Sequence, residues 1–144
     1  MESIRESAME LLGAGPAQVR TSLAVVERLH QGLRWTRAQQ LMELGRFSKK
    51  ELASLLGESE STLRRRLRSE EDMDLVVSDR AYRVARVLVL ARDLFDGDSN
   101  KIHSWLHRPQ PGLGERRPID VMDTSEGAQE VERLLIRVLD GGIA

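Results

Sequence analysis

The chain has 144 residues, a formal net charge of −1 at pH 7 and no cysteine. This length allows one or two small domains with their own cores, and the lack of cysteine excludes disulfides and thiolate metal sites. Charges interrupt the start of the chain, and the most apolar stretch, residues 84–90, is too short to span a bilayer, so we expect a soluble, cytoplasmic protein without a signal peptide or membrane anchor. Only 3% of the residues are aromatic and strand-like alternation is hard to find, which predicts an all-α fold.

Two helices are expected before residue 32. The first spans residues 1–12, ends before Gly13, and is interpreted as a tail or a dimerisation arm. The second spans residues 17–31 and ends at Gly32. Their apolar residues at helical spacing are Ile4, Ala8, Leu11 and Leu12 in the first helix and Val19, Leu23, Val26 and Leu29 in the second. His30 is expected to be a partly buried structural residue, because no second type of metal ligand lies near it.

Residues 47–68 carry the pattern of two short helices joined at a glycine. Ser48 and Glu51 can form a capping box at the start of the first helix. Gly57 can end that helix in a left-handed conformation, and Ser59 can cap the second helix. This order is typical of a helix-turn-helix, in which the first residues of the second helix reach base edges in the major groove.

The same stretch is locally basic. Between Gly45 and Arg68 the chain has seven basic and three acidic residues, a local charge of +4, although the whole chain is slightly acidic. Arginine can read guanine with two hydrogen bonds, and lysine can contact phosphates. The candidate DNA-binding residues are Lys49, Lys50, Ser61, Thr62, Arg64, Arg65 and Arg68. The alternative is an ordinary helix hairpin with a solvated basic face.

Helices on either side complete the predicted fold. One over residues 35–44, stopped by Gly45, would pack across the helix pair. A long helix over residues 78–94, capped by Ser78 or Asp79, has a broad apolar face and is expected to bridge two domains. Three more helices are expected over residues 99–107, 118–122 and 125–139, the last with Val131, Leu134, Leu135, Val138 and Leu139 as its apolar face and Gly141 and Gly142 at its end.

Two histidines stand out in the 99–107 helix. His103 and His107 are four residues apart, a spacing at which two histidines can hold zinc. The glutamate that would act as general base is missing between them and no third ligand is evident, so we expect no metal site and expect Trp105 to pack inward. No nucleophile has a supporting base and no glycine loop suits a phosphate. The sequence therefore predicts neither an enzyme nor a bound cofactor.

Several short motifs, each present once, follow one another in a fixed order along most of the chain. They are Thr62-Leu63-Arg64-Arg65-Arg66-Leu67, Ser78-Asp79-Arg80, Ala91 to Gly97, Trp105-Leu106, Leu113-Gly114, Pro118-Ile119-Asp120, and Thr124 with Gly127 and Val131. In this order and spacing, from about Gly32 to Gly142, the chain resembles the Xre/MbcA/ParS antitoxins. It departs from the family pattern at Glu115, which stands where the family has a second glycine.

The resemblance implies a bipartite protein: an N-terminal arm over residues 1–16, a helix-turn-helix DNA-binding domain over residues 17–69, and a toxin-binding domain over residues 70–144. It implies an antitoxin of a type II toxin-antitoxin system that covers the active site of a RES-domain, NAD-consuming toxin and, as a homodimer, represses its own operon by binding operator DNA. NAD chemistry would belong to the toxin.

The C-terminal half also offers parts of a protein-binding surface: a Pro/Gly loop with paired arginines, an apolar last helix and a short end. The candidate toxin-binding residues are Trp105, Arg108, Leu113, Arg116, Arg117, Gly141, Gly142 and Ile143. The alternative function is a helix-turn-helix transcriptional regulator whose C-terminal helices only dimerise or sense a ligand.

Overall fold

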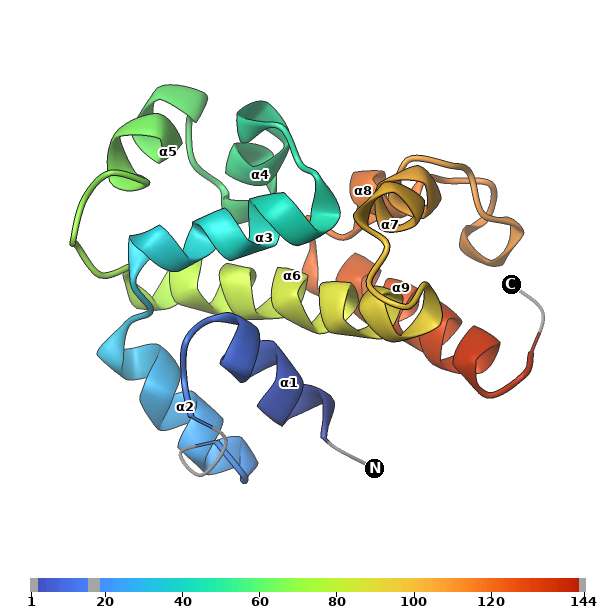
Figure 1. The fold of residues 1–144 in the computed structure, drawn as a ribbon, viewed down its shortest axis with the longest axis horizontal. Helices are drawn as coiled ribbons and strands as arrows, with labels where there is room; N and C mark the ends of the chain where they lie inside the picture. The colour runs from blue at the N-terminus through green and yellow to red at the C-terminus, as the bar shows by residue number, and fades with distance from the viewer. Residues whose placement is uncertain (1–2, 16–18, 143–144) are drawn as a thin grey trace.

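The computed structural model describes residues 3–15 and 19–142, and it confirms the all-α prediction (Figure 1). The elements are α1 (Ile4–Leu11), α2 (Ser22–Gln31), the 3-10 turn η2 (Trp35–Arg37), α3 (Ala38–Gly45), α4 (Lys49–Leu56), α5 (Glu60–Arg66), α6 (Leu75–Leu94), α7 (Ser99–Leu106), the 3-10 turn η3 (Pro111–Leu113), α8 (Pro118–Val121) and α9 (Ser125–Leu139). Within the described ranges, no helix is long and apolar enough to cross a membrane.

Helix α6 lies at the centre of the fold, as its broad apolar face predicted. Helices α1, α2, α3, α4, α7 and α9 all pack against it. It begins at Leu75, earlier than expected, because the Asp74 carboxylate caps it by accepting a hydrogen bond from the Val77 N–H at 2.9 Å. Ser78, an expected cap, is instead fully buried and its hydroxyl accepts a hydrogen bond from the Leu33 N–H at 3.0 Å. That bond fixes the chain after α2 onto α6.

Helix α1 packs against α6 and is not the free tail that the sequence suggested. Ala8, Met9 and Leu12 are almost completely buried, and Ile4 and Leu11 pack at the edge of the same core. A helix of eight residues is not stable alone in water, so this burial holds it in place. A role for this segment in dimerisation stays a prediction.

The buried face around α2 agrees with the prediction only in part: Val19 and Leu29 are buried as expected, and Leu23 and Val26 are not. Val25 and Leu29 point into the core, whereas Leu23 and Val26 are 75% and 45% exposed. His30, expected to be partly buried, is exposed. Both pairs of apolar residues have helical spacing, so the sequence pattern could not decide which side faces α6.

The predicted helix over residues 35–44 forms as η2 followed by α3. Gly45 is the last residue of α3 and not its left-handed terminator, a role that Arg46 takes with φ of 52°. The glycine is needed for another reason. A Cβ at position 45 would lie 2.5 Å from the ring of Phe47, which is buried beneath it.

The helix-turn-helix forms as predicted. The Ser48 hydroxyl accepts a hydrogen bond from the Glu51 N–H at 3.1 Å, and the Glu51 carboxylate accepts one from the Ser48 N–H at 2.9 Å, which confirms the capping box. Gly57 is left-handed with φ of 73° and ends α4. The Ser59 hydroxyl accepts a hydrogen bond from the Thr62 N–H at 3.1 Å and caps α5, which ends two residues earlier than expected.

The C-terminal half follows the predicted order of helices. Asp98 caps α7, Pro118 is the first residue of α8, and Thr124 caps α9. On α9 the expected apolar face is buried except at its end, where Leu139 is 39% exposed. The core side chains of both halves form one contiguous cluster around α6, so the two halves are joined by packing as well as by the chain.

Candidate functional site

Two surfaces carry the site residues that the sequence predicted. Figure 1 places α5 near one end of the long axis of the molecule and the loop after α7, together with the end of α9, toward the other end. Helix α6 runs between the two surfaces. The hydrophobic core therefore separates them, and each can meet a different binding partner.

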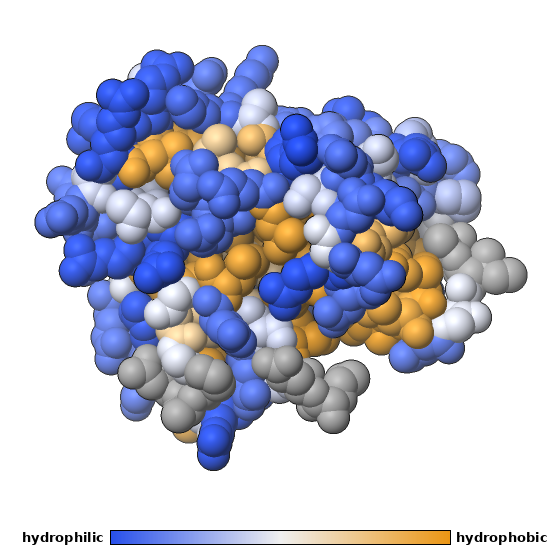
Figure 2. Space-filling model, in the orientation of Figure 1, coloured by the Kyte–Doolittle hydropathy of each residue, from blue (hydrophilic) through white to orange (hydrophobic). Residues whose placement is uncertain are grey.

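The exposed face of α5 carries most of the candidate DNA-binding residues. Ser61, Arg64, Arg65 and Arg68 are exposed, as are Lys49 and Lys50 in the first turn of α4. Figure 2 shows mostly hydrophilic residues in the region of α5, with a small hydrophobic patch among them. Thr62 is half-buried and its hydroxyl accepts a hydrogen bond from the Ser59 hydroxyl at 2.8 Å. Thr62 therefore lies in the first turn of α5 and takes part in its cap, while its neighbours Ser61 and Arg64 are exposed.

The arginines of α5 differ in how firmly they are held. Arg66 pairs with Glu71 and lies over the ring of Trp35, so it belongs to the structure of the domain. Arg64 lies 3.4 Å from Glu60 in an exposed pair, which costs little to break. Within residues 3–15 and 19–142, Arg65, Arg68, Lys49 and Lys50 form no ion pair. These four cations can meet phosphates without losing an internal partner.

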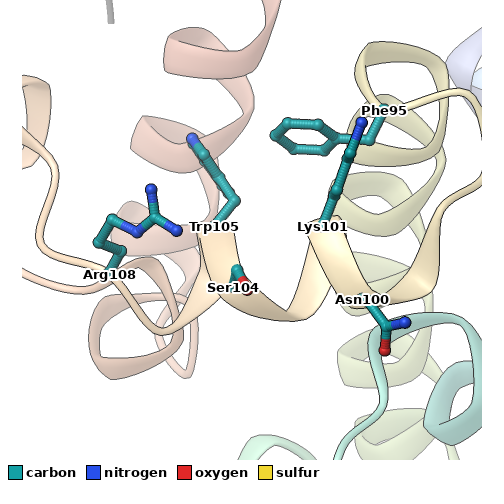
Figure 3. Close-up of a pocket in the computed structure, with 6 residues that line it drawn as sticks. All are labelled: Phe95, Asn100, Lys101, Ser104, Trp105 and Arg108. Atoms are coloured by element: carbon teal, nitrogen blue, oxygen red, sulfur yellow. The ribbon is translucent and has the colours of Figure 1, made fainter.

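A shallow hollow of about 310 Å³ lies along α7. It is lined by Phe95, Asn100, Lys101, Ser104, Trp105 and Arg108. Figure 3 shows Lys101 and Trp105 pointing to the side of α7 on which the ring of Phe95 lies, with Arg108 beside Trp105. The hollow combines two aromatic rings with two cations, a mixture suited to an apolar side chain flanked by acidic groups.

Only part of the predicted toxin-binding set comes together here. Trp105, which is 9% exposed, and Arg108 line the hollow. Phe95 and Lys101 were missed, although the four-residue spacing of Lys101 and Trp105 on α7 places them on one helix face. The remaining predicted residues lie elsewhere: Leu113 is buried, Arg116, Arg117, Gly141 and Gly142 are exposed, and Ile143 lies outside the described residues.

Of the paired loop arginines, Arg117 is already engaged. Its guanidinium donates two hydrogen bonds to Asp120, at 2.7 and 2.9 Å. These bonds lower the pKa of the Asp120 carboxyl and raise the pKa of Arg117. Arg116 forms no ion pair with any described residue, and its carbonyl oxygen accepts a hydrogen bond from the Gln110 N–H at 3.1 Å.

Gln110 holds the loop between α7 and α8 in shape. It is 7% exposed, and its side-chain amide donates to the carbonyl oxygens of Trp105 and Arg108, each at 3.2 Å. Glu115, which stands in place of a family glycine, is left-handed with φ of 64°. That conformation favours glycine, so Glu115 holds a backbone geometry that a glycine would adopt more easily.

The two histidines connect α7 to the helix-turn-helix. Their rings stack with centroids 3.9 Å apart. His107 Nδ1 lies 2.8 Å from the His103 carbonyl oxygen, and its Nε2 lies 2.5 Å from a carboxylate oxygen of Glu51 in α4. In the part of the chain that the structure describes, no cluster of three or more potential metal-ligating side chains occurs. The pair thus forms a contact between the two halves of the chain.

A titration experiment tests this contact. Burial raises the pKa of the Glu51 carboxyl, but hydrogen bonds from Ser48 and His107 outweigh it, so the pKa lies below its ordinary value. A carboxyl of this kind stabilises the fold above its unfolded-state pKa, and the contribution is lost as pH falls through the folded-state pKa. We expect the wild-type chain to have a larger free energy of unfolding in urea than Glu51→Gln at about pH 7, and the difference to vanish well below about pH 4.

Glutamine is the matched replacement for Glu51, because it retains the acceptor of the capping box but does not titrate. A difference between the two proteins that stayed constant down to about pH 3 would contradict a charged contact with His107. A constant difference in the free energy of unfolding would then have to come from packing at this position alone.

Comparisons with known proteins match both halves of the chain. Residues 24–86 match a family described as "Antitoxin Xre-like helix-turn-helix domain". Residues 90–141 match a family described as "Antitoxin Xre/MbcA/ParS C-terminal toxin-binding domain". The first match contains α4 and α5, and the second contains the hollow on α7 and the loop that follows it.

Curated relatives carry matching descriptions. "Antitoxin Xre" of Photorhabdus laumondii is 32% identical over 113 residues, which span 78% of this chain and 76% of the relative. "Antitoxin Xre" of Yersinia enterocolitica is 42% identical over 64 residues, or 44% of this chain and 43% of the relative. "Prs ADP-ribosylating antitoxin" of a Sphingobium species is 44% identical over 43 residues, or 30% of this chain and 27% of the relative.

Proposed function

Because this chain belongs to the Xre/MbcA/ParS family of antitoxins, we propose that it neutralises a RES-domain, NAD-consuming toxin by covering the toxin's active site, and that it represses its own operon. Membership of this family makes the chain an antitoxin of a toxin-antitoxin system, with a regulatory rather than an enzymatic role. The observation that carries the finer proposal is the order of two matched parts on one chain, a DNA-binding part followed by a toxin-binding part.

The DNA half of the proposal rests on α5. We propose that its first turn enters the major groove, with Ser61, Thr62, Arg64 and Arg65 near base edges. Lys49, Lys50 and Arg68 would contact phosphates on either side. Support comes from their exposure and from the local charge of +4 between Gly45 and Arg68. We propose that the protein acts in the cytoplasm, where operator DNA and cellular NAD are both found.

The toxin half of the proposal rests on the hollow along α7. We propose that Trp105 and Arg108, joined by Lys101, receive a segment of the toxin, and that the loop bearing Leu113, Arg116 and Arg117 and the end of the chain at 141–143 lie against the toxin around its active site. We keep the functional division into residues 1–16, 17–69 and 70–144, with a homodimer as the working assembly. The structure joins the two larger parts through α6, so the division concerns binding partners rather than separate cores.

Co-expression tests this function directly. The gene adjacent to that of this chain is expressed in a bacterial host with and without the antitoxin, and cell growth and cellular NAD are measured. We expect the adjacent product alone to stop growth and deplete NAD, and the antitoxin to restore both while copurifying with it. A harmless neighbour, or a toxin that leaves NAD unchanged, would overturn the proposed RES partner.

Charge reversal tests the hollow. We expect Lys101→Glu combined with Arg108→Glu to weaken toxin binding by about 2–5 kcal/mol, the range for losing buried charge pairs across an interface. Isothermal titration or a competition pulldown measures the loss. Both side chains are exposed, so the fold should be unaffected. The matched control is Arg92→Glu with Arg133→Glu, which makes the same charge change on α6 and α9, and equal losses in both proteins would contradict the assignment.

A further inference from the structure

We propose that Arg80 of α6 is a positioning residue for operator binding, because it fixes the turn between α4 and α5 and thereby the direction in which α5 meets DNA. Its guanidinium donates a hydrogen bond from Nη1 to the carbonyl oxygen of Leu56, the last residue of α4, at 3.2 Å. The Arg80 side chain is half-buried, and it forms no ion pair with any described residue. The inference rests on the DNA half of the proposed function.

The end of α4 has a use for this donor. The last four carbonyl groups of an α-helix lack a partner within the helix. The N–H groups of the two residues that follow α4 donate to the carbonyl oxygens of Ala53 and Ser54, at 2.9 and 3.2 Å. The Leu56 carbonyl receives its hydrogen bond from Arg80 instead. A cation is also favoured at the negative end of a helix dipole, so the guanidinium stabilises this end by its charge as well as by its hydrogen bond.

The guanidinium of Arg80 also packs directly against the turn. A Cβ at Gly57 would lie 2.0 Å from Nη1 of Arg80 and 2.9 Å from its Cζ. Glycine therefore meets two requirements at this position. It adopts the left-handed φ of 73° that ends α4, and it leaves room for the guanidinium against the backbone. The turn is thus held to α6 by close contact in addition to the hydrogen bond at Leu56.

Helix α5 depends on this turn for its orientation. Among the described elements it packs chiefly against α4, and Leu63 is the one buried residue of its seven. Its C-terminal end is tied to the domain by the pair of Arg66 with Glu71. Its first turn, which carries the residues proposed to reach base edges, follows the α4–α5 turn directly. Hydrogen bonds weaken steeply outside their usual distance and angle, so a rotation at the turn would cost several base contacts together.

The backbone that carries Arg80 is firmly anchored. Ser78 and Ala81, on either side of it, are fully buried, and the Ser78 hydroxyl accepts a hydrogen bond from the Leu33 N–H at 3.0 Å. The side chain of Arg80 therefore connects the rigid core to the turn of the helix-turn-helix. The motif Ser78-Asp79-Arg80 gains a physical meaning from these contacts: its serine fixes the chain that enters the DNA-binding part, and its arginine fixes the turn within that part.

Operator binding by single variants of the full chain tests the inference. We expect Arg80→Ala to weaken binding to the operator by roughly tenfold or more, because several base contacts are displaced at once. Its affinity for an unrelated duplex of the same length, and the salt slope of that affinity, should stay at the wild-type values, since a positioning residue contacts no phosphate. The matched control is Arg83→Ala, which removes the same charge three residues further along α6 and should bind the operator as the wild type does.

The possible failures are distinguishable from one another. If Arg80→Ala is folded by circular dichroism and binds the operator as tightly as the wild type, the inference is refuted and the proposed function stands. Equal losses on operator and unrelated DNA, with a salt slope reduced by about 1, would make Arg80 a phosphate contact and also refute the positioning role. A wild-type chain that binds no DNA from its own operon would refute the proposed function and this role with it.

Amide chemical shifts of the free protein, measured by NMR, provide a second readout that does not involve DNA. We expect Arg80→Ala to change the shifts from Gly57 through the first turn of α5, and Arg83→Ala to leave them unchanged. Arg80→Lys should restore part of these shifts and part of the operator affinity, because an ammonium group can still donate to the Leu56 carbonyl. A loss of operator affinity in Arg80→Ala without any change of shifts at the turn would overturn the inference.

Discussion

Replacing Arg64 or Arg65 with alanine should weaken binding to the operator by about 1–3 kcal/mol each, which corresponds to roughly 5- to 150-fold, if the guanidinium reads a base. The reason is geometric: both side chains project from the exposed face of α5, and a guanidinium forms two parallel hydrogen bonds with a guanine edge. Arg65 has no internal ion pair with a described residue, and the pair of Arg64 with Glu60 is exposed, so neither loss should disturb the fold.

Fluorescence anisotropy with a labelled operator measures this effect at several salt concentrations. A base contact should reduce discrimination against mutated operators, whereas a phosphate contact should weaken all DNA equally and reduce the salt slope by about 1. Arg133→Ala is the matched control, because it removes the same exposed charge from α9. Toxin binding should persist in all three variants. Loss of operator and toxin binding together, in a protein that still folds, would refute the division of labour.

The sequence predicted the helix-turn-helix because its signals are local. The capping box joins Ser48 to Glu51, three residues on, and Gly57 ends α4 through its own backbone conformation. Such contacts need no knowledge of the remaining chain. The central position of α6 was predictable for a similar reason. Its apolar residues are too many for one face of a helix, which indicates that the helix is buried on more than one side.

Features that depend on distant partners were not predictable. Ser78 was expected to cap a helix, but its hydroxyl is bonded to Leu33, 45 residues earlier in the chain. The inner and outer apolar pairs of α2 have similar spacing, and only contact with α6 distinguishes them. The hollow on α7 combines Trp105, which the sequence singled out, with Phe95, which follows the end of α6. No local pattern could join residues from two helices in this way.

The largest effect on stability is expected for Gly127→Ala in the first turn of α9. A Cβ at this position would lie 1.6 Å from the carbonyl oxygen of Val121 and 2.9 Å from the hydroxyl of Thr124. The Thr124 hydroxyl caps α9 by accepting a hydrogen bond from the Gly127 N–H at 3.0 Å, so neither neighbour can move without loosening the start of the helix. This gives a physical reason for the combination of Thr124 and Gly127 at the start of α9.

The sign of this effect is informative, because alanine in place of glycine ordinarily stabilises a helix by about 1 kcal/mol. Overpacking against fixed backbone costs about 1–3 kcal/mol and sometimes more, and the close approach at Val121 places Gly127→Ala at the upper end. We expect a net loss of about 2 kcal/mol or more, seen in thermal melts as a fall of at least roughly 4 °C. Gly15→Ala, where no described residue lies within 4 Å of the new Cβ, should change stability by less than about 0.5 kcal/mol. A Gly127→Ala protein as stable as the wild type would show that the turn between α8 and α9 can open to admit a side chain, and the glycine would then have to serve binding rather than folding.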